Sequence, residues 1–167
     1  MSRICTFAYG SNMLTARLRE RVSSAAAVGT GRLPGHVLKW HKRSRDGSGK
    51  CDIESTGLNE EVVWGVLFEL DSAEKPALDR AEGLNDGYTE RQLDIITDCG
   101  TVRAVAYIAT AKDAALRPYH WYKAFVVAGA REHGLPPEYL QSLENATSIP
   151  DPNAARAVKN EQLLAAS

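Results

Sequence analysis

Two short segments of this chain carry residues that could do chemistry. The first is Tyr9-Gly10-Ser11-Asn12, which follows a short apolar run and precedes a helical pattern. A glycine lets the backbone turn tightly, and successive amide N–H groups in such a turn can converge on an anion. The same residues are also typical of an ordinary strand-to-helix turn in which Ser11 or Asn12 caps the helix. The pattern alone leaves both interpretations open.

The second segment is residues 78–83, Leu-Asp-Arg-Ala-Glu-Gly, where Glu82 falls in the last turn of a predicted helix. The helix dipole disfavours an acid at that end. Leu78 and Ala81 indicate that the helix end is partly buried, and desolvation would raise the pKa of the Glu82 carboxyl. A carboxylate of raised pKa can act as a general base near neutrality. A solvated surface glutamate is the competing interpretation.

Metal-ligating patterns are missing from the sequence. Cys5, Cys51 and Cys99 are widely spaced, and an odd number of cysteines without an export signal indicates reduced thiols in a cytoplasmic protein. His36 and His41 are five positions apart on a predicted strand, which would direct them to opposite faces. We therefore expect no metal and no cofactor.

The overall composition narrows the class of partner. The chain has 167 residues, with 20 Lys and Arg against 21 Asp and Glu, so its formal net charge is −1. That balance gives no electrostatic reason to expect nucleic acid or an anionic membrane as a partner. No apolar run approaches the ~18 residues that span a bilayer, and the first ten residues do not resemble a signal peptide. We expect a cytoplasmic protein with a small-molecule partner.

The first two thirds of the chain contain more predicted strand than helix. A helix is expected over 15–22, and a second one begins at Asp71, where Glu74 would complete a capping box, and stops at Gly83. The polar segment 43–50 is expected to be a mobile loop. Strands are predicted over 4–9, 25–33, 37–42, 51–56, 62–70, 92–97 and 101–109.

The last third is predicted to be helical, with helices over 119–133 and 138–145. Beyond residue 150 the chain is rich in alanine and is expected to be a peripheral tail, giving one domain over 1–150 and a tail over 151–167. Because strands outnumber the helices between them without strict alternation, the pattern favours an α+β fold with a mixed or antiparallel sheet that could close on itself.

Phe7-Ala8-Tyr9-Gly10-Ser11-Asn12-Met13 resembles the signature of the γ-glutamylcyclotransferase family. Four further segments resemble family blocks, occur in the family's order and extend the likeness over residues 4 to about 145. They are Val-Trp-Gly-Val-Leu at 63–67, Leu-Asp-x-x-Glu-Gly at 78–83, the strand around Tyr107, and the helical block from Tyr122 to Tyr139. The helical block favours the γ-glutamylcyclotransferases proper over their shorter γ-glutamylamine relatives.

This resemblance implies a small mixed β-barrel flanked by helices, with a cavity at one end. The implied reaction is an intramolecular aminolysis of acyltransferase or lyase type, in which the α-amino group of a γ-glutamyl amino acid or amine attacks its own γ-carbonyl. The products are 5-oxoproline and the free amino compound, without a cofactor.

The resemblance also implies roles for individual residues. Glu82 would be the base, and the amides of Gly10, Ser11 and Asn12 would hold the developing oxyanion and the substrate carboxylate. Tyr9 would line the pocket, while Tyr107 and Tyr122 either offer hydroxyl groups or only pack in the core.

Several questions stay open at this level. The same fold could release a γ-glutamyl group from a different amine, such as an antibiotic intermediate or a crosslink product, or serve as a noncatalytic binding module. Segment 84–88 is expected to border the leaving amino compound. Segment 43–50 either folds over an anionic substrate or is an ordinary solvated loop. The sequence does not distinguish a monomer from a homodimer.

Overall fold

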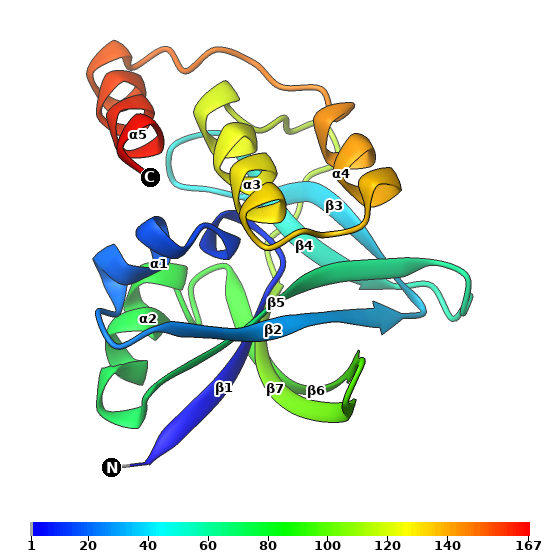
Figure 1. Cartoon of the computed structure of the whole chain (residues 1–167). Coiled ribbons are helices and arrows are strands. Elements are labelled where there is room, and N and C mark those ends of the chain that lie inside the picture. The colour runs from blue at the N-terminus through cyan, green and yellow to red at the C-terminus, as the bar shows by residue number, and fades with distance from the viewer. Residues whose placement is uncertain (1) are drawn as a thin grey trace.

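The computed structural model describes residues 2–167 and has a closed β-barrel at its centre (Figure 1). The barrel strands are β1 (Arg3–Ala8), β2 (Ala26–Pro34), β5 (Val62–Asp71), β6 (Tyr88–Thr97) and β7 (Gly100–Ala109). A separate antiparallel pair is formed by β3 (His36–Arg43) and β4 (Gly49–Ser55). The helices are η1 (Ser11–Met13), α1 (Thr15–Arg21), η2 (Ser72–Glu74), α2 (Lys75–Glu82), α3 (His120–Glu132), α4 (Pro137–Glu144) and α5 (Ala154–Ala166).

The strand order around the barrel is β1-β5-β2-β6-β7. Neighbours in that order pair antiparallel, and the barrel closes where β7 meets β1 in parallel, with Val105 opposite Thr6. A single parallel junction among antiparallel pairs makes the barrel mixed. The expectation of an α+β fold with a small mixed β-barrel is confirmed.

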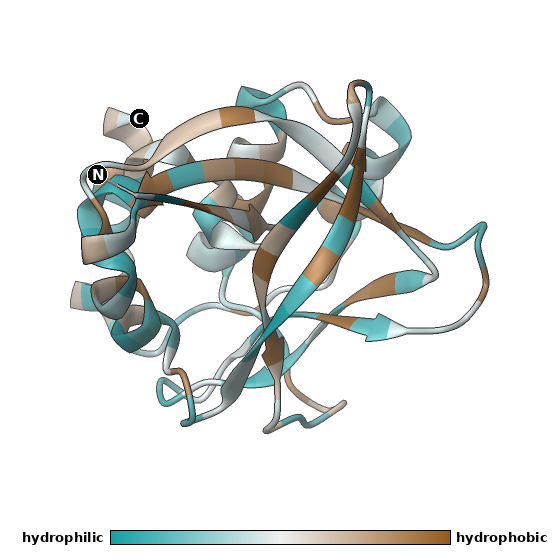
Figure 2. Ribbon diagram, turned by 90° about the horizontal axis from the view of Figure 1, so that it is seen from below, coloured by the Kyte–Doolittle hydropathy of each residue, from teal (hydrophilic) through white to brown (hydrophobic). Residues whose placement is uncertain are grey.

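The core of the barrel is formed by the apolar side chains of its strands. In β5, Val66, Phe68 and Leu70 alternate along the chain and are completely buried, which places them on one face. Leu67 lies on the other face and is only 2% exposed, so β5 is covered on both sides and its sequence is almost continuously apolar. Figure 2 shows other strands on which hydrophobic and hydrophilic residues alternate, as expected for strands with one buried face.

Helices lie on two sides of the barrel, with α1 beside α2 and with α3, α4 and α5 grouped together (Figure 1). The predicted apolar face of the first helix is confirmed, because Leu14, Leu18 and Val22 are all buried. Gly129 allows α3 to pack directly on the chain that follows β1. A Cβ atom at Gly129 would lie 2.5 Å from the Leu14 nitrogen. This close approach fixes the position of the η1 turn.

The predicted capping box at Asp71 is wrong. The Asp71 carboxylate accepts a hydrogen bond from the Ala73 amide at 3.0 Å and so caps η2. The Glu74 carboxylate accepts from the Ser23 hydroxyl and from the amide and hydroxyl of Ser24. The cause is a tertiary contact. Ser23 and Ser24, which follow α1, donate to the Glu74 carboxylate in place of the Asp71 amide.

Segment 43–50 is tied down, which differs from the expected solvated, mobile loop. The Ser44 amide donates to the Ser48 carbonyl at 3.1 Å, and the Ser48 hydroxyl donates to Asp46 at 2.6 Å. The Tyr119 hydroxyl from the start of α3 donates to the Asp46 carbonyl at 2.6 Å. Ser48 is completely buried, because α3 covers this turn.

Two further boundaries differ from the sequence prediction. Strand β6 begins at Tyr88, four residues before the predicted start at Gln92, because Tyr88 to Arg91 continue the pairing with β7. Residues beyond 150, expected as a peripheral tail, contain α5, which packs against α3. The division into a domain over 1–150 and a tail over 151–167 stays a prediction. No helix within residues 2–167 is long and apolar enough to cross a bilayer.

Asp151 connects α5 to α3. Its buried carboxylate accepts two hydrogen bonds from the Arg156 guanidinium, each 2.6 Å long, and one from the Trp121 indole N–H at 2.8 Å. The Asn153 amide donates a fourth bond at 2.8 Å. The hydrogen bonds from Arg156 are the main reason that the pKa of Asp151 lies well below its usual value.

We expect Asp151→Asn to lower the melting temperature at pH 7 by roughly 2–6 °C, because it weakens charge-assisted hydrogen bonds. A depressed native pKa contributes stability that is complete above the unfolded-state pKa of about 3.9 and is lost as the pH falls below it. The difference between wild type and variant should therefore shrink between pH 5 and pH 3 in thermal unfolding followed by circular dichroism. The exposed Asp98→Asn is the control. A difference that is equally large at pH 3 would contradict the assignment.

Candidate active site

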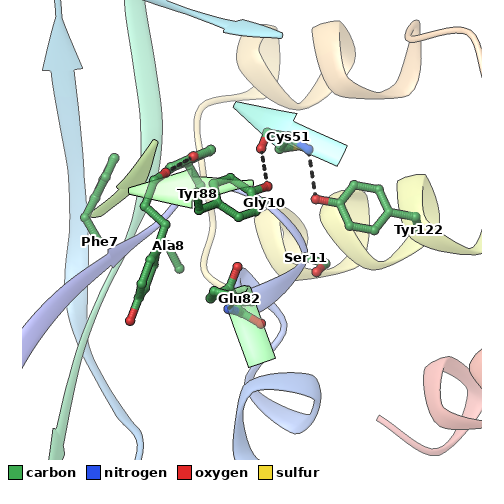
Figure 3. Close-up of a pocket in the computed structure, with 11 residues that line it drawn as sticks. Phe7, Ala8, Gly10, Ser11, Cys51, Glu82, Tyr88 and Tyr122 are labelled. Carbon is green, nitrogen blue, oxygen red and sulfur yellow. Dashed lines mark hydrogen bonds between the residues drawn. The ribbon is translucent and has the colours of Figure 1, made fainter. Parts of the chain in front are cut away.

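A small cavity of about 50 Å³ lies where β1 leaves the barrel and enters the η1 turn. Seven residues singled out from the sequence line it: Tyr9, Gly10, Ser11, Asn12, Glu82, Tyr107 and Tyr122. The remaining lining residues are Phe7, Ala8, Cys51 and Tyr88. Figure 3 shows how strand β1, the end of α2, strand β4 and helix α3 each contribute side chains to this space.

Glu82 is held at the cavity by the way α2 ends. Gly83 has a φ of 76°, in the left-handed region that glycine adopts without strain. The Leu84 amide donates to the Asp79 carbonyl at 2.9 Å and the Gly83 amide to the Arg80 carbonyl at 3.2 Å, which is the Schellman pattern of a helix C-terminus. The predicted stop at Gly83 is confirmed, and Glu82 is the last helical residue.

The Glu82 carboxylate is anchored through one of its two oxygens. Its Oε1 accepts hydrogen bonds from the Asn12 side-chain amide and from Arg21 Nη1, the latter at 3.0 Å. Arg21 Nη1 also donates to Asn12 Oδ1 at 2.9 Å, which closes a triangle of side chains. Among residues 2–167, no donor is assigned to Oε2. The Glu82 side chain is 15% exposed, so the carboxylate is fixed, partly buried and has one oxygen available.

The turn at Gly10 has backbone amides for which residues 2–167 provide no assigned acceptor. The Met13 amide donates to the Gly10 carbonyl at 3.1 Å, which is the first bond of η1, so the preceding amides have no intrahelical acceptor. Neither η1 nor α1 has a side-chain N-cap bond. The interpretation of Ser11 or Asn12 as a helix cap is therefore wrong: the Ser11 hydroxyl accepts from Arg17 Nε at 2.9 Å, and Asn12 contacts Glu82.

Gly10 is required for close packing. Its backbone, with φ −113° and ψ −140°, is in neither the helix nor the strand conformation. A Cβ atom at Gly10 would lie 3.1 Å from both Cys51 Cβ and the Tyr122 hydroxyl. A side chain here would push these two residues away from the cavity wall.

Tyr88 and Tyr122 bind the backbone of Cys51 in β4, one at its carbonyl and the other at its amide (Figure 3). The Tyr88 hydroxyl donates to the Cys51 carbonyl at 2.8 Å, and the Tyr122 hydroxyl accepts from the Cys51 amide at 3.0 Å. Burial raises the pKa of both phenols well above the usual value, so both stay neutral. The O–H of Tyr122 keeps its own proton for donation.

The hydroxyl groups of Tyr9 and Tyr107 are already engaged within the protein. Tyr9 donates to the Tyr107 carbonyl, and Tyr107 donates to Asp79 Oδ1 at 2.6 Å. Tyr107 therefore joins the barrel to α2 rather than offering a free hydroxyl group. Both rings contribute walls to the cavity.

Arg21, Cys51 and Tyr88 were missed by the analysis of the sequence. Tyr88 ends segment 84–88, which was expected to border the leaving group, but nothing marked the tyrosine itself. Arg21 carried no motif, because an arginine in the last turn of a short helix is ordinarily a solvated residue that complements the helix dipole.

One group of potential metal ligands lies outside the cavity. His41 Nε2 is 2.7 Å from Asp52 Oδ2 and 3.6 Å from Glu54 Oε1. The Lys112 ammonium group lies 3.6 Å and 3.5 Å from the same two carboxylates and supplies their countercharge. These side chains act as an ion-pair cluster between β3, β4 and the end of β7. The expected absence of a resident metal stays a prediction.

The chain is similar to known proteins both in sequence and in fold. The AIG2-like family matches residues 62–143, which include β5 and Glu82. A solved structure titled γ-glutamyl cyclotransferase superposes with a TM-score of 0.89 at 26% identity, covering 99% of this chain and 100% of the other.

Curated γ-glutamylcyclotransferases are similar along most of their length. The Homo sapiens protein is 33% identical over 144 residues, which is 83% of this chain and 76% of that protein. The Bos taurus protein is 28% identical over 169 residues, covering 94% of this chain and 84% of that protein. The chain belongs to the γ-glutamylcyclotransferase family.

The packing around Gly10 predicts that substrate affinity falls as the side chain at this position becomes larger. Gly10→Ala requires Cys51 and Tyr122 to move by a few tenths of an ångström, whereas Gly10→Val adds two methyl groups at the same contact and disrupts the wall. We expect calorimetry with a γ-glutamyl dipeptide to show weaker binding in the order wild type, alanine variant, valine variant. Affinity in the valine variant equal to that of wild type would remove this turn from the binding site.

Proposed function

We propose that this protein is a γ-glutamylcyclotransferase that converts a γ-glutamyl compound to 5-oxoproline and a free amino compound by intramolecular aminolysis. The observation that carries the proposal is a fixed carboxylate, Glu82, beside a turn with unpaired amides inside one cavity. The named relatives support an enzyme over a noncatalytic binding module.

Glu82 is the general base of the proposed reaction. The substrate's α-amino group arrives mainly as an ammonium ion and must lose a proton before it can attack. Oε1 is occupied by Asn12 and Arg21, so Oε2 is the atom that takes this proton. The same carboxyl group then returns the proton to the leaving nitrogen as the amide bond breaks. The freed carboxylate takes the second proton that the attacking nitrogen loses in becoming the lactam N–H and passes it to the released amine, which departs as an ammonium ion, so no water is consumed.

The turn and the tyrosines hold the substrate in the reactive conformation. The amine nitrogen forms a bond to the γ-carbonyl carbon, and negative charge develops on the carbonyl oxygen. The amides of Gly10, Ser11 and Asn12 are the proposed donors to that oxygen, and the Tyr122 O–H is a further donor at the same wall. Because nucleophile and electrophile share one molecule, orientation alone can contribute up to about 7–11 kcal/mol.

The proposal includes a cytoplasmic setting and no metal or cofactor. Each step above uses only side chains and amides of this chain. The thiols of Cys5, Cys51 and Cys99 are free, which supports a reducing compartment. The cavity walls offer one carboxylate and one buried thiol, and burial raises the pKa of that Cys51 thiol to about 12, so it stays protonated and a weak ligand.

Glu82→Gln tests the proposed base. Glutamine keeps the size of the side chain and an oxygen for Asn12 and Arg21 but cannot accept the proton, so 5-oxoproline release should fall by ~10²–10⁴-fold. Binding of the substrate, measured by calorimetry, should change far less. Glu138→Gln on the exposed start of α4 is the matched control. More than a tenth of wild-type turnover in the Glu82 variant would show that another group is the base.

A further inference from the structure

A second cavity of about 240 Å³ adjoins the first one. The two share four lining residues: Ser11, Glu82, Tyr88 and Tyr122. The second cavity, called the basic chamber here, is also lined by Arg17, Arg21, Lys42 and Lys50, with Ser44, Asp46, Ala81 and Trp121 completing its wall. A molecule that reaches Glu82 can therefore extend into the basic chamber.

Two of the four cations in the basic chamber have carboxylate partners. Arg21 pairs with Glu82 at 3.0 Å. Lys50 pairs with Asp46 at 3.1 Å and lies over the Trp121 ring at 4.3 Å. These pairs leave the chamber with two positive charges that no acid of residues 2–167 balances within 4 Å.

Lys42 is one of the two unbalanced cations. It is only 8% exposed, and its Nζ lies 4.5 Å from the centre of the Tyr88 ring. Desolvation lowers the pKa of its ammonium group. A partly desolvated ammonium without a carboxylate partner costs free energy, part of which a bound anion would recover.

Arg17 is the other unbalanced cation. Its guanidinium group lies 4.6 Å from the centre of the Phe125 ring, and its Nε donates to the Ser11 hydroxyl. Desolvation lowers the pKa of this group to about 10, so it is charged at neutral pH. Nη1 and Nη2 have no acceptor assigned among the described residues, and a guanidinium fork suits a carboxylate.

Both unbalanced cations are placed at residues that the two cavities share. Arg17 contacts Ser11 and Lys42 contacts Tyr88, so an anion between them would lie next to Glu82. When the glutamyl part of the substrate is curled against the Gly10 turn, the leaving nitrogen must point away from that turn. The basic chamber is the adjoining space into which the leaving compound would then extend.

We propose that the basic chamber binds the carboxylates of the leaving amino compound and that Lys42 and Arg17 select an acidic amino acid, aspartate or glutamate, as the leaving group. Two unbalanced positive charges match two carboxylates, whereas a neutral amine or amide would leave both charges unpaired. This inference rests on the proposed function, since it names the leaving group of that reaction.

The substrate series that tests this inference is γ-glutamyl-aspartate, γ-glutamyl-alanine and γ-glutamyl-alaninamide, which carry two, one and no carboxylates on the leaving group. We expect kcat/KM for 5-oxoproline release to fall in that order, mainly through KM. Lys42→Met removes the charge and keeps the unbranched stem, so the preference for the aspartate compound over the alaninamide compound should fall by about 10-fold or more. Lys39→Met, on the exposed side of the same strand, should keep the wild-type preference.

Two outcomes of the series would overturn the inference. Equal kcat/KM values for the three substrates in the wild-type enzyme would show that no leaving-group carboxylate is recognised. Equal losses for all three in Lys42→Met, with a melting temperature close to wild type, would place the Lys42 contact on the glutamyl part.

A measurement without turnover separates this inference from the proposed function. We expect free aspartate to bind the wild-type protein more tightly than asparagine does in calorimetry, and we expect Lys42→Met to abolish the difference. If no substrate yields 5-oxoproline but aspartate still binds with this dependence on Lys42, the proposed reaction fails and the anion site stands. Equal binding of aspartate and asparagine would overturn the anion site, whether or not the protein is active.

Discussion

The contact among Asn12, Arg21 and Glu82 is the interaction on which the site depends. It joins three segments that are far apart in the sequence: the turn after β1, the end of α1 and the end of α2. The helix dipole makes the C-terminus of α2 an unfavourable place for an acid, and the guanidinium group and side-chain amide offset that cost. Anchoring a single carboxylate oxygen leaves the other one for chemistry. The barrel, the Schellman end of α2 and the packing of Gly129 on the turn all serve to hold this triangle in place.

Charge is distributed unevenly around that carboxylate. On the barrel side the cavity is built from neutral groups, because burial keeps the phenols of Tyr88 and Tyr122 and the thiol of Cys51 protonated. On the other side lie four cations and only two acids, Glu82 and Asp46. A neutral wall suits a carbonyl group that becomes negative only in the transition state, whereas a positive wall suits a group that is negative throughout. One substrate with a reacting amide and a carboxylated leaving group matches both sides.

The sequence contained most of what defines the barrel and the centre of the site. Apolar strand patterns and turn residues predicted each strand within a few positions, and the segments around Gly10 and Glu82 were found from residue type and spacing. Closure of the barrel through a parallel β1–β7 junction could not be predicted, because periodicity does not report which strands pair.

Arg21 was missed for a similar reason: it meets Glu82 across 61 positions, and on its own helix it looks like a surface residue. The ordered turn at 44–48 was misjudged because a polar, glycine-containing segment is ordinarily solvated, whereas here α3 covers it. Helix α5 was not predicted, because its attachment to α3 depends on the ion pair between Asp151 and Arg156, which periodicity does not report.

The central claim, that an amine of the substrate itself is the nucleophile and Glu82 its base, is tested most directly by the first product formed in ¹⁸O-labelled water. From a γ-glutamyl dipeptide, we expect unlabelled 5-oxoproline as the initial product, and we expect no cleavage of the same dipeptide acetylated on its α-nitrogen. Labelled glutamate as the initial product, or cleavage of the acetylated compound at a comparable rate, would show that the carboxylate activates water instead.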